Sequence, residues 1–251
     1  MTTQNVYDDP DFFAAYLKLR RSVQGLAGAP EWPALSDLLP DLAGRRVLDL
    51  GCGLGWFGRC ARAQGAASVL AVDVSANMLT RARAMTGDAA IEFRKMDLEH
   101  ARFEAGTFDL AFSSLTFHYL ADLDRLLAAI GDGLRPGGTL VFSVEHPVFT
   151  APSRQQWLIT SEGRRVWPVR RYAIEGPRLF DWLGAAVVKQ HRTFGTWVNA
   201  LLRQGFVLRH VQDWGPSAQQ VRDNPALAVE IERPMFLLIR ADRPKGRSRR
   251  G

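Results

Sequence analysis

The stretch VLDLGCGLGWFGRC, residues 47–60, decides the fold, because an apolar run leads directly into four closely spaced glycines. Gly53, Gly55 and Gly58 have the G-x-G-x-x-G spacing of a loop that holds a dinucleotide phosphate. Gly51, Gly53 and Gly55 have a tighter G-x-G-x-G spacing. Either loop joins a strand to a helix, so both interpretations predict a strand-loop-helix unit at the start of an α/β sheet.

Strands and helices alternate after this unit, as a doubly wound parallel sheet requires. The hydrophobic periodicity predicts five strands, at 47–50, 68–72, 91–95, 108–114 and 139–144. The predicted helices between them run over 56–64, from Ser75 through Met85, and along the apolar stripe 123–134. Before the first strand, Asp9-Pro10 and Trp32-Pro33 mark the starts of two short helices.

The end of the chain departs from a plain dinucleotide fold. Residues 145–195 show no clear period, and then a helix at 196–204 stops at Gly205. Strands follow at 206–211 and 235–241, and we expect no helix between them because prolines interrupt that connection. The last strand is therefore predicted to be antiparallel. The expected fold is a Rossmann-like, mostly parallel seven-stranded sheet with helices on both faces, whereas a nicotinamide domain has six strands.

The composition of the chain fits one domain. It has 251 residues, 47% hydrophobic and 23% charged. The net charge of +6 comes mostly from the last nine residues, which include Arg243, Lys245, Arg247, Arg249 and Arg250. Such a tail is typical of a disordered end, so we expect no nucleic-acid partner. No apolar run reaches the roughly 18 residues that cross a bilayer, and the acidic start is not typical of a secretory signal. We expect no membrane partner and a cytoplasmic location.

Side chains around the glycine loop favour a cationic ligand over a phosphate. In a nucleotide loop the pyrophosphate meets the amino terminus of the following helix, where bulky side chains would crowd it. This chain places Trp56 and Phe57 there. Asp49, at the end of the strand, would repel a pyrophosphate but attract an ammonium or sulfonium group.

Five motifs in this order resemble those of the class I S-adenosylmethionine (SAM)-dependent methyltransferases, of the small-molecule type 11 or quinone-biosynthesis kind. They are VLDLGCGLG (47–55), AVDVS (71–75), MDLEH (96–100), FDLAFSS (108–114) and LRPGG (134–138). The match covers about residues 45–145 and continues in the terminal strand pair. This resemblance implies that SAM is the cofactor, that S-adenosylhomocysteine is its product and that the chain is an enzyme.

The resemblance also implies which residues hold the cofactor. Gly51, Gly53 and Gly55 would line the methionine part. Asp73 would bind both ribose hydroxyls, and Asp97 would accept a hydrogen bond from the adenine amino group. Further implied contacts are Asp49, Cys52, Trp56, Val74, Met78, Met96, Leu98 and Ser113. The alternatives are a helix-capping role for Asp73 and a turn role for Asp97, and we interpret Cys52 as a small loop residue rather than a nucleophile.

Four residues are candidates for catalysis: His118, Glu145, His146 and His191. His118 follows the fourth strand, where this architecture faces the transferred methyl group, and the alternative is a packed histidine. Glu145 and His146 are neighbours that point in different directions, so at most one should reach the substrate. His191 could equally lie on a solvated basic face. A base is helpful but not required, because positioning alone supplies much of the rate.

These patterns divide the chain into five parts. We predict a helical lid at 1–44, the SAM-binding core at 45–144, a substrate-specificity insertion at 145–195, the terminal helix and hairpin at 196–242, and the basic tail at 243–251. The insertion is rich in aromatic residues, which as a set favours a small apolar or aromatic substrate; the alternative is that they form a small core of the insertion itself. Methyl transfer to oxygen, nitrogen or carbon stays open.

Other chemistries are less well supported by the residues. Base-methylating enzymes carry a D/N/S-P-P-aromatic loop where this chain reads SSLT, 113–116, and no cluster predicts a metal ion. The competing hypotheses are an NAD(P)-dependent oxidoreductase and a SAM-binding module without chemistry. Both a monomer and a homodimer fit the sequence.

Overall fold

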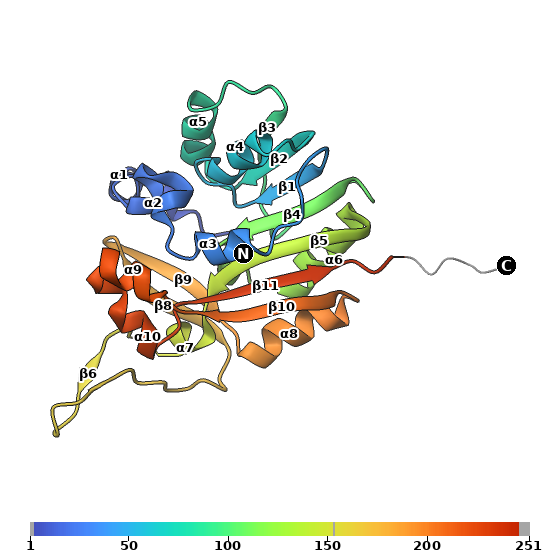
Figure 1. Ribbon diagram of the computed structural model, residues 1–251. Coiled ribbons are helices and arrows are strands. Elements are labelled where there is room, and N and C mark those ends of the chain that lie inside the picture. The colour runs from blue at the N-terminus through green and yellow to red at the C-terminus, as the bar shows by residue number, and fades with distance from the viewer. Residues whose placement is uncertain (1–2, 153, 246–251) are drawn as a thin grey trace.

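The computed structural model describes residues 3–152 and 154–245, and its core is a seven-stranded sheet in the order β10-β11-β5-β4-β1-β2-β3 (Figure 1). The strands are β1 (Arg46–Leu50), β2 (Ser68–Asp73), β3 (Ile91–Lys95), β4 (Phe108–Ser114), β5 (Leu134–Glu145), β10 (Val207–Trp214) and β11 (Phe236–Asp242). Neighbours from β5 to β3 pair in parallel, whereas β11 is antiparallel to both β5 and β10. The predicted α/β fold with an antiparallel last strand is confirmed.

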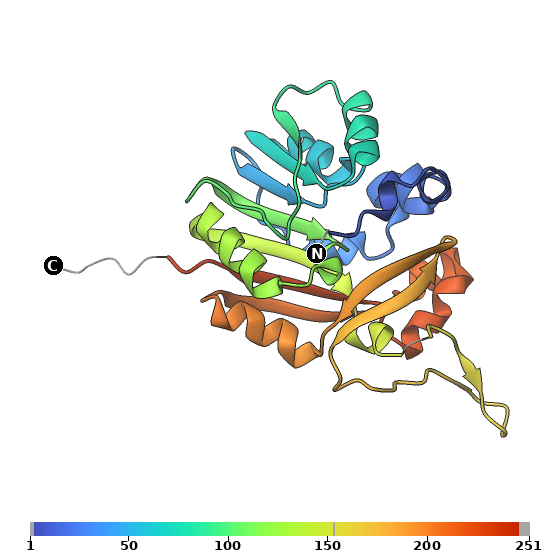
Figure 2. The same ribbon diagram turned by 180° about the vertical axis from the view of Figure 1, so that it is seen from behind.

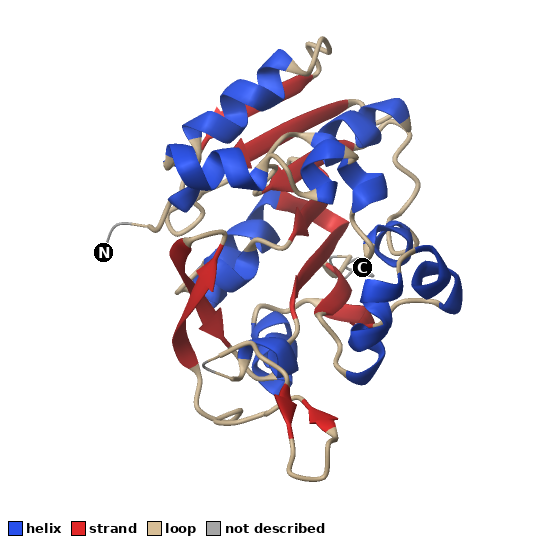
Figure 3. Cartoon of the chain, turned by 90° about the vertical axis from the view of Figure 1, so that its left-hand side faces the viewer, coloured by secondary structure: helices blue, strands red, loops and turns tan. Residues whose placement is uncertain are grey.

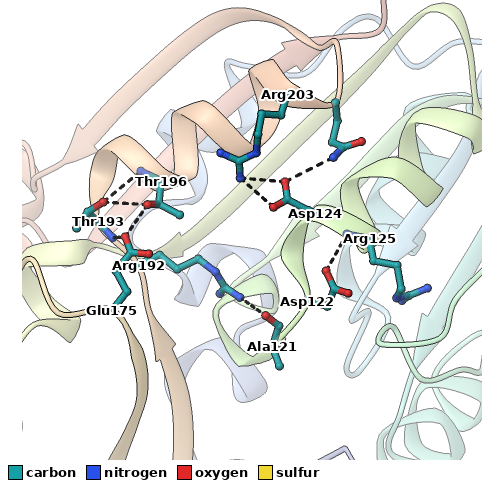
Figure 4. Close-up of polar contacts among 10 residues, drawn as sticks. Ala121, Asp122, Asp124, Arg125, Glu175, Arg192, Thr193, Thr196 and Arg203 are labelled. Atoms are coloured by element: carbon teal, nitrogen blue, oxygen red, sulfur yellow. Dashed lines mark hydrogen bonds and ion pairs between the residues drawn. The ribbon is translucent and has the colours of Figure 1, made fainter.

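Helices cover both faces of the sheet. On one face α3 (Trp32–Ser36) and α4 (Trp56–Ala63) contribute to an apolar cluster with β1 and β11. On the other face the cluster includes α6 (Leu123–Gly133) and α8 (Phe194–Arg203), which lie beside each other (Figure 2). Arg203 of α8 donates to Asp124 of α6 at 2.9 Å (Figure 4). The fifth helix of the core, α5 (Ala76–Ala84), packs against β2 and β3.

Short helices precede the sheet: η1 (Val6–Asp8), α1 (Pro10–Tyr16), α2 (Arg20–Val23) and η2 (Gly25–Gly28). The start of α1 is as predicted, since the Asp9 carboxylate accepts from the Phe12 amide at 2.9 Å and Pro10 takes the first helical position. Figure 1 shows these helices at the edge of the sheet toward which β4 and β5 run, opposite the end of β11. Parallel strands usually bind ligands at that edge.

The region 145–195 contains two hairpins that the sequence did not reveal. After α7 (Pro147–Thr150), β6 (Leu158–Ile159) pairs with β7 (Arg165–Val166), and β8 (Gly176–Trp182) pairs with β9 (Ala185–His191). Figure 3 shows the β6–β7 hairpin projecting from the body of the protein and the β8–β9 hairpin lying against that body. The β8–β9 turn places Leu183 and Gly184 at φ 53° and 78°. Such a turn normally carries Asn-Gly, so the Leu-Gly pair in the sequence did not indicate a hairpin here.

The prediction that no helix connects the last two strands of the sheet is wrong. That connection holds α9 (Ala218–Asp223), η4 (Pro225–Ala228) and α10 (Val229–Glu232). Ser217 caps α9 in a reciprocal pair with Gln220, and Pro225 opens η4. The prolines start and separate short helices here instead of excluding them, because the first helical position tolerates proline.

The predicted basic tail at 243–251 lies outside the described residues from 246 onward. Its first residue continues from β11, since the Arg243 amide donates to the Gly138 carbonyl at 2.8 Å. Within the described ranges, none of the helices has the length and apolar character needed to cross a bilayer.

Candidate active site

A cavity of about 310 Å³ opens where β1, β4 and β5 end, and its walls also include the amino-terminal helices and the β8–β9 hairpin. It therefore joins segments that are far apart in the sequence. The predicted site residues that line it are Gly51, Gly53, Asp73, Val74, Met78, Asp97, Leu98, His118 and Glu145.

The glycine loop forms one wall of the cavity because its backbone turns sharply after β1. The amides of Gly51 and Cys52 both donate to the Val72 carbonyl of β2, at 2.9 and 3.0 Å. Gly51 has φ +72°, and a Cβ there would lie 2.1 Å from the Thr116 hydroxyl. Only glycine fits this position without a clash, because the Thr116 side chain already fills the space where a Cβ would stand.

Two carboxylates stand at the ends of neighbouring strands on the same wall. Asp73, the last residue of β2, accepts from the amides of Gly53 and Ser75 at 2.8 and 2.9 Å. Burial raises the pKa of Asp73, while those backbone hydrogen bonds work in the opposite direction. Asp97 follows β3 and accepts from the Thr3 hydroxyl at 2.6 Å.

Asp49 lies beneath the loop, next to the cavity rather than in its lining. It is buried, and its Oδ2 has no hydrogen-bond partner among the described residues. Burial, and then the nearby charge of Asp73, raise the pKa of Asp49 to about 8. The site therefore holds a carboxyl group that a nearby cation would ionise.

The opposite end of the cavity is formed by three segments. His118 lies in η3 (Phe117–Tyr119), Glu145 ends β5, and Lys189 lies on β9. Lys189 donates to Glu145 at 2.6 Å, and both side chains are largely buried. The Glu145 amide donates to His118 Nδ1 at 3.3 Å. Burial, followed by the charges of Lys189, Arg192 and Arg21, holds the pKa of His118 well below its usual range.

His146 and His191 do not lie in the cavity lining, and structural contacts occupy their rings. His146 caps α7 by accepting from the Val148 amide, and its Nε2 pairs with Asp213 at 2.7 Å. His191 contacts the Thr150 hydroxyl at 2.8 Å and the Tyr172 carbonyl at 2.9 Å. Neither geometry supports the predicted catalytic role, because neither ring has a nitrogen free for a substrate.

The other predicted cofactor residues are not part of the cavity lining. Gly55 precedes α4 as its N-cap residue at φ +72°, and the Ser113 hydroxyl donates to the Leu50 carbonyl at 2.8 Å. Trp56 packs under Arg59, whose guanidinium lies 4.5 Å from the ring centroid. Met96 packs against the apolar core, and Cys52 is a free thiol whose pKa burial raises well above its usual value. Their contacts with a cofactor stay predictions.

Sequence reasoning missed Lys189 and Arg21, which also line the cavity. A period of two could have indicated Lys189, since Val187, Lys189 and His191 share the buried face of β9. Arg21 pairs with the buried Glu31 at 2.8 Å. No short-range sequence pattern predicts the Arg21–Glu31 ion pair, because Glu31 lies beyond the turn at η2.

The charges of the cavity suit a cationic ligand without phosphates. Asp49, Asp73 and Asp97 surround the glycine loop, and the two cations of the lining are neutralised by Glu31 and Glu145. Asp73 and Asp97 line the cavity and the buried Asp49 lies next to it, so carboxylates are gathered where a positively charged cofactor such as SAM would be stabilised. No group of three or more potential metal ligands occurs within 3–152 and 154–245.

Comparison with known proteins decides between the two cofactors. A family model described as a methyltransferase domain matches residues 48–142. The crystal structure of an S-adenosylmethionine-dependent methyltransferase from Mesorhizobium loti is 51% identical, covers 87% of this chain and all of its own, and has a TM-score of 0.85. This chain belongs to the SAM-dependent methyltransferases. It is an enzyme whose cofactor is SAM, and the nicotinamide hypothesis is set aside.

Two curated relatives show how far the likeness extends. An uncharacterized protein of Haemophilus influenzae is 32% identical to this methyltransferase over 249 residues, with 94% of this chain and 96% of the relative covered. Malonyl-[acyl-carrier protein] O-methyltransferase of Erwinia billingiae is 40% identical over 101 residues. That match covers 40% of this chain and only 39% of the relative. The chain thus spans about two fifths of that relative's length.

Proposed function

We propose that this methyltransferase acts on a small, planar, apolar or aromatic molecule. The observation that carries the proposal is that one cavity runs from Asp73 and Asp97 to His118 and Glu145. Its volume of about 310 Å³ is at the lower end of the range for small-molecule sites. The acceptor end is walled by aromatic side chains, namely Tyr7, Tyr16, Tyr119 and Trp182. Such walls suit a flat apolar molecule.

On the cofactor side, the proposal assigns one contact to each part of the ligand. Asp73 takes the ribose hydroxyls, and Asp97 takes the adenine amino group. Met78 and Leu98, both buried lining residues, pack against the adenine. Asp49 stabilises the positive charge from below the loop, because an unpaired buried carboxylate gains most from a nearby cation.

When bound, SAM supplies a methyl group on a sulfonium: the acceptor bonds to that carbon as the carbon–sulfur bond breaks, and the electron pair stays on sulfur. The protein's own task is to hold the acceptor in line and to exclude water. Residues Thr3 to Asp8 serve this task as part of the proposed lid. Asp8 accepts from the Ser75 hydroxyl at 2.6 Å and from the Asn77 amide at 3.1 Å, and Gln4 accepts from the Val188 amide at 2.7 Å. The segment therefore bridges α5 and the insertion.

The first test is ligand binding by calorimetry. SAM and S-adenosylhomocysteine should bind, and Asp73→Asn should weaken both by at least about tenfold, since a hydrogen bond to a charged group is lost. Asp88→Asn is the matched control, because Asp88 is half-buried and pairs with Arg62 away from the cavity. NAD⁺ should not bind.

The second test follows the methyl group. The protein is incubated with isotopically labelled SAM and fractionated cell metabolites, and labelled products are identified by mass spectrometry. Label in a small aromatic or apolar compound supports the proposal. Label that appears only in RNA or on a carrier protein would refute the assigned substrate class.

A further inference from the structure

The acceptor end of the cavity offers hydrogen-bond donors to a ligand, and none of its described side chains is placed to remove a proton. Besides tyrosines, the titratable side chains that line this end are those of Arg21, His118, Glu145 and Lys189. The carboxylates of Asp73 and Asp97 lie at the cofactor end instead. Which of the four groups can give or take a proton therefore decides what kind of molecule can be methylated.

His118 is a donor rather than a base. Its Nδ1 accepts from the Glu145 amide at 3.3 Å, so the neutral ring carries its proton on Nε2. No described residue pairs with Nε2, and Nε2 is not one of the side-chain atoms closed to solvent. A second proton would have to sit on Nδ1, where it would face the Glu145 N–H. Burial, and then the charges of Lys189, Arg192 and Arg21, hold the pKa of His118 well below its usual range. The ring therefore stays neutral with its Nε2–H toward the cavity.

Tyr119 supplies a second donor beside the imidazole. The two rings are neighbours on η3, with their centroids 4.4 Å apart. The Tyr7 hydroxyl donates to the Tyr119 hydroxyl at 3.4 Å, which leaves the proton of Tyr119 without a partner among the described residues. Tyr119 is half-buried and lines the cavity. Burial raises the pKa of its phenol, so the group keeps its proton and donates.

Glu145 cannot serve as the base. Its Oε1 accepts from the Lys189 ammonium at 2.6 Å, and its Oε2 is closed to solvent. The Lys189 ammonium also lies 5.4 Å from the Trp182 ring centroid, so an aromatic wall helps to hold it at the carboxylate. The pair is neutral as a whole and both of its side chains are largely buried. It therefore neither takes a proton from a ligand nor strongly repels an anion.

We infer that the acceptor molecule is a planar ring that bears a carboxylate, and that this enzyme forms its methyl ester. The inference rests on the proposed function, since it concerns the substrate of the same site. His118 Nε2–H and the Tyr119 hydroxyl donate to the carboxylate. A carboxyl group titrates near pH 4, so at neutral pH it enters the site already ionised and needs no base. A neutral phenol or a protonated amine would have to lose a proton at an end where none of these side chains takes it.

The transfer balances without a proton. A carboxylate oxygen bonds to the methyl carbon as the carbon–sulfur bond breaks, and the electron pair stays on sulfur. An anion and a sulfonium become a neutral ester and a neutral thioether. Because both charges disappear, a site with little water favours the step. The two donors hold the carboxylate in place, and no oxidant, reductant or metal ion takes part.

The first test compares benzoate with benzamide on the protein saturated with S-adenosylhomocysteine. The two probes have nearly the same shape, but only benzoate is charged. We expect benzoate to bind at least about tenfold more tightly, since hydrogen bonds to an ionised group are the stronger ones. Tyr119→Phe and His118→Asn should each reduce that preference to about threefold or less. Asparagine keeps an oxygen near the place of Nδ1, which accepts from the Glu145 amide, but it lacks Nε2.

Matched variants outside the cavity separate recognition from folding. His210→Asn is the control for His118→Asn, because His210 is exposed and lies outside the lining. Tyr172→Phe is the control for Tyr119→Phe, because the Tyr172 hydroxyl accepts from the Phe194 amide away from the cavity. Both controls should keep the full preference. If His118→Asn fails to fold, Tyr119→Phe, which loses one hydroxyl only, carries the test.

The second test identifies the bond that forms. The protein is incubated with methyl-labelled SAM and a cell metabolite extract, and the labelled products are treated with dilute alkali. A methyl ester releases its label as methanol, whereas methyl ethers, methylamines and C-methyl groups keep it. We expect the label to become volatile.

Three results would overturn the inference: a label that resists alkali, equal affinity of benzoate and benzamide for the wild-type protein, or an unchanged preference in both the His118 and Tyr119 variants. Binding of S-adenosylhomocysteine is measured first in each sample. Its absence would contradict the proposed function. Its presence together with any of the three results would contradict only the carboxylate acceptor.

Discussion

SAM binding should release a proton from Asp49, and this is the sharpest consequence of the site's electrostatics. Burial, and then Asp73, raise the pKa of Asp49 to about 8, so its carboxyl group is mostly protonated in the free protein at neutral pH. A cation bound above the loop favours the carboxylate. The group therefore holds a proton in the free state and loses it in the complex, so raising the pH favours binding.

The size of the effect follows from the pKa. With a value of about 8, roughly nine tenths of the Asp49 carboxyls carry a proton at pH 7. Between pH 6 and 7 the affinity for SAM should then rise nearly tenfold, or about 1.4 kcal/mol. The ligand's own amino group titrates near pH 7.7 to 8.0 and acts in the opposite direction, so the window ends at about pH 7.5.

Calorimetry in two buffers with different ionisation enthalpies counts the released protons. The wild-type protein should release about 0.9 proton more per SAM bound at pH 7 than Asp49→Asn. Asp73, whose pKa burial also raises, interacts with Asp49 through its charge, so Asp73→Asn is measured beside Asp49→Asn to separate the two contributions. Asp88→Asn should behave as wild type. Equal proton release from wild type and Asp49→Asn, or an affinity that does not change between pH 6 and 7, would refute the reasoning.

Three further predictions concern the loop, the lid and the buried imidazole. Gly53→Ala should lower the free energy of unfolding by about 1–2 kcal/mol, from the positive φ of Gly53 alone. Gly51→Ala should lower it further, because the added Cβ would also meet Thr116 at 2.1 Å. Equal losses for the two variants in urea denaturation would contradict this. Asp8→Ala should lower the free energy of unfolding by about 1 kcal/mol, since Asp8 accepts hydrogen bonds from Ser75 and Asn77 at the start of α5. It should also make the amino-terminal segment sensitive to protease. Unchanged protease resistance would argue against a lid. Because burial keeps the pKa of His118 well below its usual value, the unfolded chain binds a proton that the native protein does not. Stability should therefore fall as the pH drops below about 6.5, and His118→Gln should flatten that slope in urea titrations; an unaltered slope would exclude His118 as its source.

Short-range sequence patterns were sufficient to predict the sheet and the residues at the cofactor side of the cavity. Asp9, Ser75 and Gly205 each mark a helix boundary through a contact within a few residues, and such contacts can be read from sequence. The residues implied by the five motifs lie at or near strand ends. Because the carboxyl ends of parallel strands share one edge, the order of the motifs predicted that they gather there.

The acceptor side could not be predicted in the same way. Glu145 and Lys189 lie 44 positions apart, and their contact depends on how the β8–β9 hairpin folds back onto the sheet. The turn of that hairpin uses Leu183 at positive φ, a conformation that tertiary contacts impose and that leucine does not favour. Lys189, beside His191 and Arg192, then looked like part of a solvated basic face, because a buried lysine is explained only by its partner.

The two partnerless carboxylate oxygens lie at opposite sides of the site, and the sheet explains how the protein tolerates both. Asp49 Oδ2 lies near the end of β1 and Glu145 Oε2 at the end of β5, the strands on either side of β4. Each unsatisfied buried group costs about 1–3 kcal/mol, which apolar clusters on both faces of these strands offset. Water could satisfy both oxygens if the site were open. Because both oxygens are instead closed to solvent, their burial weakens the free protein, and the raised pKa of Asp49 is one consequence of it.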